Sequence, residues 1–267
     1  MSLYDRFNRR IHYLRISVTD LCNLRCTYCM PADGVDLMRH DEILSFEEIT
    51  EFTRVAVAMG VDKVRLTGGE PLVRRGIVDL VTMIGRIPGI RDYAMTTNGV
   101  LLPTYARDLK NAGIDRINIS LDTVSPDRYR CITRVGSLDE VLAGIRAAQA
   151  VGFKQIKINC VIDTSPEEPD AQAVAAYGKE QGLEVRFIRK MDTASGKFWR
   201  VLGGDGGHCQ SCNRLRLSAN GNLYPCLFSD QVYSIRVLGM KQAIERAVYA
   251  KAESGHKSNH LFYQIGG

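Results

Sequence analysis

The chain has 267 residues, of which 45% are hydrophobic, and this is enough for one large domain or for one domain with a small appendage. No run of about 18 apolar residues occurs and the first residues are charged, so we expect a cytoplasmic protein without a membrane-spanning helix. The net charge of +5 is spread along the chain without a Lys/Arg block, so we expect no nucleic-acid partner.

Strand and helix patterns alternate along the chain. Six strands are predicted, at residues 13–18, 63–67, 93–97, 116–120, 155–161 and 184–188. The first helix begins at a capping box of Ser45 and Glu48 and runs to about residue 60. Later helices are predicted up to residue 84 and at 103–113, 138–151 and 170–181. Because a full barrel has eight such units, the expected fold class is α/β, an incomplete (β/α)6 TIM-like barrel.

Polar residues occupy every second position of these strands. Four of the polar residues are basic: Arg15, Arg65, Lys157 and Arg186. Because side chains on a strand point to alternate faces, one face should pack under the helices and the other should line the barrel interior. Unpaired buried charges are costly, so we interpret the interior as a cavity for an anion. The alternative is an internal ion-pair network with the acidic residues Glu70, Asp122 and Glu184.

Six of the eight cysteines fall into two groups, and a cytoplasmic chain favours metal binding over disulfides for them. The first group, Cys22, Cys26 and Cys29, follows the first strand. Three thiolates can bind three irons of a 4Fe–4S cube and leave the fourth iron open for chemistry. A zinc loop or half of a disulfide framework is the alternative.

The second group is Cys209, Cys212 and Cys226, and its alternative is a zinc ribbon completed by His208 or a distant ligand. Arg214 and Arg216 alternate on one strand of a hairpin that turns at Asn220-Gly221. They therefore share a face, and two guanidinium groups beside a cluster are suited to phosphate. Of the two remaining cysteines, Cys160 lies in an apolar strand and is expected in the core, whereas Cys131 stands alone.

The first cysteine group, with Tyr28 directly before Cys29, resembles the signature of the radical S-adenosylmethionine (radical SAM) superfamily. The resemblance implies that the open iron chelates SAM and that one electron then releases a 5′-deoxyadenosyl radical. The segment Gly68-Gly69-Glu70-Pro71 resembles the part of these enzymes that holds the methionyl amine. Tyr28 would lie near the adenine, and Ser120 near the ribose or carboxylate of SAM.

Further motifs make the chain similar to the GTP 3′,8-cyclase family, which begins molybdenum cofactor biosynthesis. They lie at residues 14–22, 67–72, 96–99, 116–122, 186–188, 212–217 and 266–267. The resemblance implies two 4Fe–4S clusters, bound by Cys22, Cys26 and Cys29 and by Cys209, Cys212 and Cys226. It implies a further SAM contact at Met191, and GTP contacts at Arg15, Arg65, Thr96, Lys157, Arg186, Arg214 and Arg216. Catalytic roles would fall on the first three cysteines, Arg214, Arg216 and the tail residues Gly266 and Gly267, which would reach into the active site.

The implied reaction begins when the deoxyadenosyl radical removes hydrogen from the ribose 3′ carbon of GTP, and the carbon radical then attacks C8 of guanine. The implied partners are GTP, a low-potential electron donor such as flavodoxin or ferredoxin, and the next enzyme of molybdenum cofactor synthesis. The chain would act as a monomer or homodimer. Residues 1–191 would form the SAM-cleaving partial barrel, and residues 192–267 a small C-terminal iron–sulfur subdomain.

Two features depart from the family pattern. Only the glycine-rich residues 192–208 connect the sixth strand to the second cysteine group, where the family has a much longer segment, so the extra strands that wall the cavity are expected to be absent. Arg189-Lys190 stands where the family has a glutamate and an apolar residue. The alternatives are another radical SAM enzyme with an auxiliary cluster, which modifies a peptide or a cofactor precursor, and a non-catalytic iron–sulfur or zinc protein.

Overall fold

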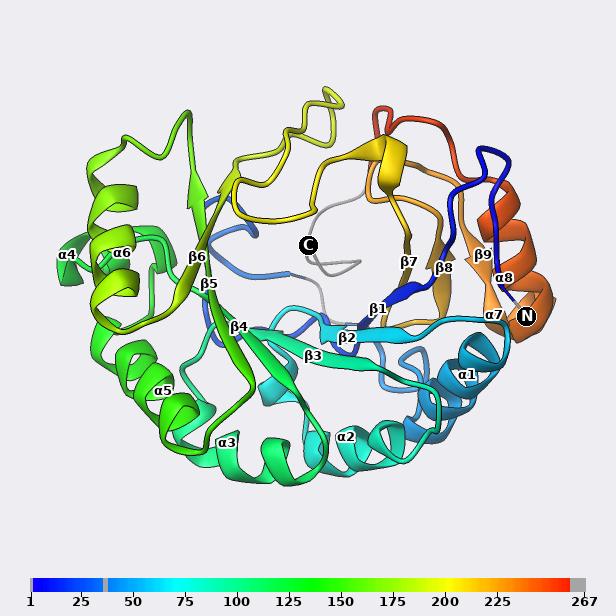
Figure 1. Ribbon diagram of the computed structural model, residues 1–267, viewed down its shortest axis with the longest axis horizontal. Helices are drawn as coiled ribbons and strands as arrows, with labels where there is room; N and C mark the ends of the chain where they lie inside the picture. Colours follow the sequence, from blue (N-terminus) through cyan, green and yellow to red (C-terminus); the bar gives the residue numbers. More distant parts are fainter. Residues whose placement is uncertain (1, 36–37, 260–267) are drawn as a thin grey trace.

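The computed structural model of the chain describes residues 2–35 and 38–259 (Figure 1). Its centre is one nine-stranded sheet with the order β6-β5-β4-β3-β2-β1-β7-β8-β9. The strands are β1 (Tyr13–Ser17), β2 (Lys63–Thr67), β3 (Asp92–Thr97), β4 (Arg116–Ser120), β5 (Gln155–Ile162), β6 (Glu184–Arg189), β7 (Arg214–Leu217), β8 (Asn222–Tyr224) and β9 (Tyr233–Ser234). Neighbours from β6 through β1 to β7 pair in parallel, whereas β8 and β9 pair antiparallel.

Helices cover the outer, convex side of this curved sheet (Figure 1). They are α1 (Phe46–Ala58), α2 (Ile77–Gly85), α3 (Leu102–Asn111), α4 (Pro126–Thr133), α5 (Leu138–Ala150), α6 (Pro169–Glu180), α7 (Ile235–Leu238) and α8 (Met240–Tyr249). The predicted capping box is present at α1, where Ser45 Oγ accepts from Glu48 N and Glu48 Oε2 accepts from Ser45 N. All six predicted strands are confirmed within one residue at each end, whereas α4, α7, α8 and β9 were not predicted from the sequence.

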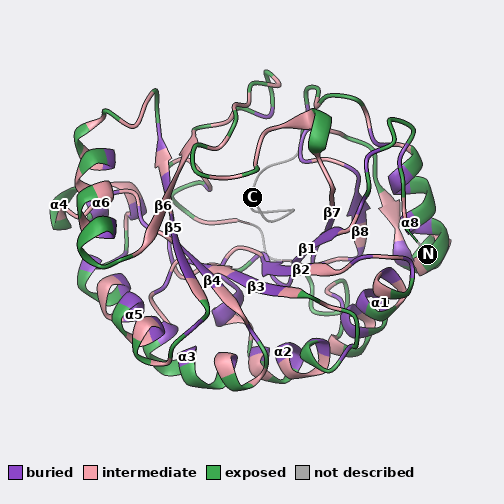
Figure 2. Ribbon diagram, in the orientation of Figure 1, coloured by how far each residue is buried: buried purple, intermediate pink, exposed green. Residues whose placement is uncertain are grey.

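The hydrophobic core lies between the sheet and the helices, as the purple inward faces in Figure 2 show. The apolar members of the alternating strands are buried there, and they include Leu14, Ile16, Val64, Leu66, Ile117, Ile119 and Ile158. Each such side chain contributes roughly 1.5–3 kcal/mol when it is fully buried. The polar residues between them must point to the other face, which is the concave side of the sheet. Cys160 is buried in this core, as predicted.

The sheet does not close into a barrel, which confirms the incomplete barrel. Its edge strand β6 is only partly buried along its whole length, and its outer side meets the following chain through one bridge, between Phe187 and Leu202. Residues 190–213, which are all described, contain two isolated bridges and the 3₁₀ turn η2 (Cys209–Ser211) but no strand. The expected absence of extra strands in this connection is therefore confirmed.

The C-terminal hairpin extends the same sheet. β7 pairs in parallel with β1, and β8 returns antiparallel after the predicted turn at Asn220-Gly221. The division of the chain at residue 191 stays a prediction, since the hairpin is bonded to β1 directly. No helix in the described part of the chain has the length and hydropathy to cross a membrane.

Candidate active site

The two cysteine groups lie beyond opposite ends of the parallel strands, which we call the carboxyl edge and the amino edge of the sheet. Cys22, Cys26 and Cys29 follow the carboxyl end of β1, whereas Cys209 and Cys212 precede the amino end of β7. Because β1 and β7 are parallel neighbours, these two ends face in opposite directions. A strand of about five residues spans roughly 16 Å at ~3.3 Å per residue. The concave face between the groups is therefore long enough for a molecule that reaches from one group to the other.

The first cysteine loop is anchored to the end of α4. Arg25 N donates to Thr133 O at 3.0 Å, and Thr27 N donates to Ile132 O at 2.9 Å. Arg134 Nη1 donates to Arg25 O at 2.8 Å and to Met30 O at 2.9 Å. The loop therefore has a fixed course although it has no regular secondary structure of its own.

The three thiols of this loop are free, partly buried and close enough to influence one another. Burial raises the pKa of Cys26 to about 12, with further contributions from Asp122, Cys29 and Cys22. Burial and Cys22 raise the pKa of Cys29 to about 11. Such thiols ionise when a metal replaces the proton, and Leu24 N already donates to Cys22 Sγ at 3.3 Å.

These donors fit an iron–sulfur cube. In the described residues, no group of three or more His, Cys, Asp or Glu side chains could hold a single metal ion. A 4Fe–4S cube takes one thiolate for each iron, so its ligands need not converge on one point. The three thiols influence one another's pKa, and one of them accepts an N–H···S hydrogen bond. They can therefore supply one thiolate to each of three irons of such a cube.

The Gly68–Pro71 segment packs directly against the start of the cysteine loop. Gly69 N donates to Thr19 O at 2.8 Å, and a side chain on Gly69 would place its Cβ 2.3 Å from Leu21 O. Only glycine permits this approach of two backbones. Glu70 is buried and accepts from Thr97 Oγ1 and Asn98 N, and burial raises its pKa to about 7 against these hydrogen bonds. The segment predicted to hold the methionyl amine therefore adjoins the first cysteine group.

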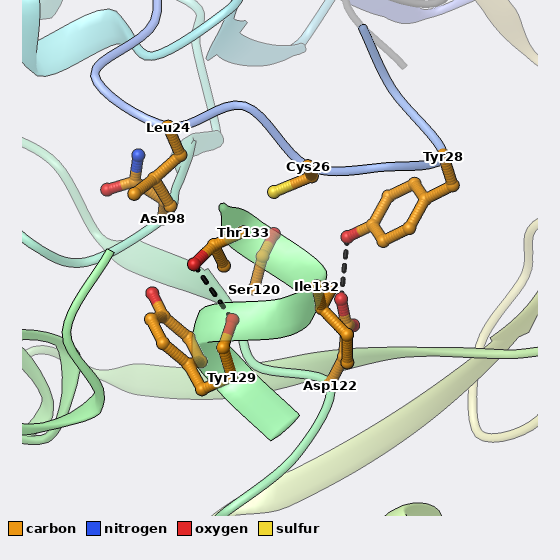
Figure 3. A pocket seen from close by; sticks show the side chains of 9 residues that line it. All are labelled: Leu24, Cys26, Tyr28, Asn98, Ser120, Asp122, Tyr129, Ile132 and Thr133. Atoms are coloured by element: carbon orange, nitrogen blue, oxygen red, sulfur yellow. Dashed lines mark hydrogen bonds between the residues drawn. The ribbon is translucent and has the colours of Figure 1, made fainter. Parts of the chain in front are cut away.

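Figure 3 shows two other predicted SAM contacts, Tyr28 and Ser120, beside this loop. Tyr28 points across a small cavity and donates its hydroxyl proton to Asp122 Oδ2 at 2.6 Å, while Cys26 and Ser120 line the same cavity. The cavity has a volume of about 30 Å³, which is room for roughly one water molecule. It is therefore a gap beside the cysteine loop, and SAM would need the wider concave side of the sheet.

The basic residues line the concave face as the alternation predicted, and two of them form ion pairs. Lys157 Nζ lies 2.6 Å from Glu184 Oε2, and Arg186 Nε lies 2.9 Å from Glu184 Oε1. The alternative of an internal ion-pair network therefore holds for this corner. The other two acids bind elsewhere, Glu70 at the end of β3 and Asp122 at Tyr28.

The other part of the concave face, formed by β1, β2 and β7, carries several positively charged side chains. Tyr13 lies opposite Arg214 and Arg15 lies opposite Arg216 in the parallel register, and Arg65 follows on β2. Burial lowers the pKa of Arg216 to about 10, and Arg214 adds to this effect. Arg65 is 7% exposed, and its Nε has no hydrogen-bond partner within the described residues. Buried cations that lower one another's pKa are stabilised by an anion.

The second cysteine group lies beside these arginines. Cys212 N donates to Cys209 O at 3.1 Å across η2, and Phe228 N donates to Cys226 Sγ at 3.4 Å. Burial raises the pKa of Cys212, but the charge of Lys251, a hydrogen bond from the Arg214 backbone, and Arg214 and Arg216 outweigh it, so the pKa lies below its ordinary value. The thiols are free, and the N–H···S bond again fits a cluster.

Four residues near these groups were not predicted as site residues. Tyr13 lies under three cations, with Lys63 Nζ 4.9 Å from its ring centroid and Arg65 and Arg214 at 5.6 and 5.5 Å. Lys63 and Tyr13 obey the same alternation as Arg65 and Arg15, which could have identified them. Asn118 is fully buried between Thr96 and Lys157, and its amide has no partner in the described part of the chain. The fourth, Lys251, carried no sequence signal.

Four further residues were predicted as site residues, namely Met191, Thr96, Gly266 and Gly267. Met191 packs against Tyr224, Leu227 and Phe228, on the side of the second cysteine group, and its assignment to SAM stays a prediction. Thr96 Oγ1 is buried without a partner among the described residues, on the same wall as Asn118. Gly266 and Gly267 lie outside the described residues.

Comparisons with known proteins show which families this chain resembles. Residues 16–176 match the family model described as the radical SAM superfamily. A protein of Geobacter sulfurreducens called GTP 3′,8-cyclase is 39% identical over 326 residues and is matched over 100% of both chains. A protein of the same name from Alkaliphilus oremlandii is 38% identical over 320 residues, which cover 98% of this chain and 99% of the relative. These aligned lengths exceed the 267 residues of the chain, so the relatives have segments that this chain lacks.

Solved structures share the fold. Streptococcus suis SuiB bound to the precursor peptide SuiA superimposes with a TM-score of 0.69 at 16% identity, over 93% of this chain and 67% of that one. The protein anSMEcpe with bound AdoMet has a TM-score of 0.62 at 14% identity, over 90% of this chain and 81% of that one. At such identities the likeness concerns the fold alone.

Proposed function

The chain belongs to the radical SAM superfamily and, within it, to the GTP 3′,8-cyclase family. On this premise we propose which residues bind the cofactors and which bind the substrate. It is a radical SAM lyase with SAM and two 4Fe–4S clusters as cofactors. It converts GTP to (8S)-3′,8-cyclo-7,8-dihydroguanosine 5′-triphosphate, the first step of molybdenum cofactor biosynthesis. The residue roles that follow are the proposal.

Cys22, Cys26 and Cys29 hold the first cluster at the carboxyl edge of the sheet, where bound SAM supplies the 5′-deoxyadenosyl radical. Gly69 lets the backbone of the Gly68–Pro71 segment approach the loop, so that its carbonyls can accept from the methionyl amine. Ser120 ends β4 at the same edge and offers a hydroxyl to SAM. Tyr28, held by Asp122, fixes one side of this site.

Cys209, Cys212 and Cys226 would hold the second cluster at the amino edge, and an open iron of this cluster would bind the guanine base. Arg214 and Arg216 are on the adjoining strand β7 and contact the nucleotide from there. Arg15 and Arg65 continue the cationic surface toward the first cluster. A nucleotide with its base at the second cluster can therefore present its ribose to the radical source.

Lys157, Arg186 and Thr96 form the other wall of the site. Glu184 holds the two cations in place and offsets part of their charge, so the phosphates of GTP meet a preformed pair. The hydroxyl of Thr96 supplies a neutral donor beside them. A triphosphate is therefore received by charged groups on both walls, where Arg binds phosphate in a bidentate manner.

The single observation that carries this assignment is the placement of two three-cysteine groups at opposite edges of the parallel pair β1–β7, with arginines on the face between them. The six thiols stay reduced in a cytoplasmic environment, which is where we place the enzyme. A flavodoxin or ferredoxin supplies the low-potential electron, and the next enzyme of the pathway receives the product.

An anaerobic turnover assay tests the proposal. Reconstituted protein with SAM, GTP and dithionite should form 5′-deoxyadenosine and a cyclised GTP product in equal amounts, and about eight irons per chain should be present. ATP in place of GTP is the matched control and should give no cyclised product. Formation of 5′-deoxyadenosine from SAM without the cyclised product would contradict the cyclase and leave only the superfamily chemistry.

A further inference from the structure

Lys251 is a buried lysine at the second cysteine group. None of the residue roles proposed for the reaction involves it. It follows α8 directly, it is 2% exposed, and its side chain is among the largest that the chain buries completely. Lysine is rarely buried in this way unless its charge is compensated. The partners of its ammonium group therefore indicate its role.

The ammonium group has three acceptors, which is the number of its N–H bonds. Lys251 Nζ lies 2.7 Å from Pro225 O, 2.8 Å from Arg214 O and 3.7 Å from Cys212 Sγ. The two carbonyls are neutral, and within the described residues no carboxylate forms an ion pair with Lys251. Of these three acceptors, only the Cys212 sulfur can carry negative charge, and the Lys251 charge also acts on the nearby Cys226 thiol, so the cysteines of this group compensate the buried ammonium.

The two carbonyls place Lys251 across the arms of the ligand hairpin. Pro225 directly precedes Cys226 on the arm that follows β8, and Arg214 lies two residues after Cys212 at the start of β7. One ammonium group therefore connects the segments that carry two of the three cysteines. Without the hydrogen bonds of Lys251, the two arms would still be joined by the short ladder between β7 and β8 and by the hydrogen bonds of Ser218 with Asn222.

A second buried cation fixes the segment that carries Lys251. Arg9 donates to Ala252 O at 2.6 Å, to Glu253 O at 3.0 Å and to Cys209 O at 2.7 Å, and it is paired with Asp5 at 2.6 Å. The N-terminal segment, dark blue in Figure 1, thus joins the chain after α8 to Cys209, the remaining cysteine of the group. Lys251 is anchored on both sides and cannot swing away from the sulfur.

We propose that Lys251 is a positioning residue of the second cluster, which holds a fixed positive charge against the Cys212 sulfur and ties together the two arms that carry Cys212 and Cys226. The inference rests on the proposed second cluster. Charge and hydrogen bonds at cluster sulfurs set the reduction potential. A positive charge favours the more negative, reduced cluster, so Lys251 keeps this cluster easier to reduce than its thiolates alone would allow.

The test uses the reconstituted full chain in which Cys22, Cys26 and Cys29 are replaced by Ala, so that only the second cluster titrates. Lys251→Met removes both charge and donors, Lys251→Gln keeps donors, and Lys251→Arg keeps the charge. A dithionite titration is monitored by electron paramagnetic resonance. The Met and Gln variants should have an equilibrium constant for one-electron reduction about tenfold lower, which lowers the reduction potential by ~59 mV, while the Arg variant stays near the parent. The exposed Lys241→Met is the matched control and should not shift.

The outcomes separate charge from shape. A Gln variant with the potential of the parent would overturn the proposal, because donors alone would then be sufficient. Iron lost from the Met and Gln variants but retained by Arg would support it, whereas iron lost from Arg as well would overturn it. A parent chain that binds no iron at this group would overturn the second cluster itself, and Lys251 with it.

Discussion

The two cysteine groups offer the same three thiols in opposite electrostatic surroundings. Around the first group the nearest charges include Asp122 and Glu70, and burial raises the pKa values of Cys22, Cys26 and Cys29. At the second group Lys251, Arg214 and Arg216 lower the pKa of Cys212 in spite of its burial, whereas burial still raises the pKa of Cys226 against the charges of Lys251 and Arg216. A surplus of nearby cations suits a group that must also attract a polyanionic nucleotide. The first group needs no such surplus, because SAM brings its own positive charge on sulfur.

The groups also differ in what anchors them. The first loop is fixed by hydrogen bonds from α4 and by Arg134, whose guanidinium reaches loop carbonyls. The second is fixed by Arg9 and Lys251, which come from the two ends of the described chain. Side chains therefore supply at the second group the anchoring that backbone hydrogen bonds with α4 and Arg134 supply together at the first. Both groups depend on contacts between segments that are far apart in sequence.

The largest expected effect comes from removing one thiol at each group. Cys22→Ala should lower 5′-deoxyadenosine formation by roughly a thousandfold, since the radical source is lost. Cys212→Ala should retain SAM cleavage but abolish the cyclised product. Iron analysis should show that each variant loses the irons of one cluster and keeps the other. Loss of all iron in either variant would show that the two groups are not independent.

The next effect concerns the cations beside the second group. Arg216→Ala should weaken GTP binding about 10–100-fold, because a hydrogen bond to a charged group contributes ~1.5–3 kcal/mol. Equilibrium dialysis gives the dissociation constant, and SAM cleavage without GTP should continue. Arg39→Ala, at an exposed arginine, is the matched control. Unchanged GTP affinity in the Arg216 variant would remove this arginine from the substrate site.

The sequence was sufficient to predict the first six strands and most of the first cysteine group. Alternation placed Arg15, Arg65 and Lys157 on one face because a strand has a fixed period of two residues. The cysteine spacing and the Gly68–Pro71 segment are local patterns, so they could be found without knowing the fold. The helix α4, which holds the first loop, was missed although Pro126 begins it.

The second group was less accessible from sequence, for a physical reason. Its position opposite the first depends on β7 pairing in parallel with β1, a contact between residues about two hundred positions apart. Lys251 and Arg9 have no periodic or motif signal, since, apart from the Asp5 partner of Arg9, their partners are backbone carbonyls and one sulfur in other segments. The ion pairs of Glu184 with Lys157 and Arg186 were foreseen only as an alternative.

The smallest effect tests the electrostatic contrast directly, through alkylation of the metal-free thiols. The pKa of Cys29 is about 11, and that of Cys212 lies below the ordinary value of a thiol. The lower pKa makes the thiolate of Cys212 more abundant at pH 8 than that of Cys26 or Cys29, and the weaker nucleophilicity of a low-pKa thiolate offsets only part of this advantage. Iodoacetamide with peptide mapping at pH 8 should therefore label Cys212 before Cys26 and Cys29. Raising the pH increases labelling of Cys26 and Cys29 about tenfold per unit, because both remain below their pKa values, whereas labelling of Cys212 should rise less steeply because its pKa is lower. The exposed Cys131 reports full access, and labelling in urea should be alike for all four. Equal rates at pH 8 in the folded protein would mean that Lys251 and the arginines do not set the charge state of the second group.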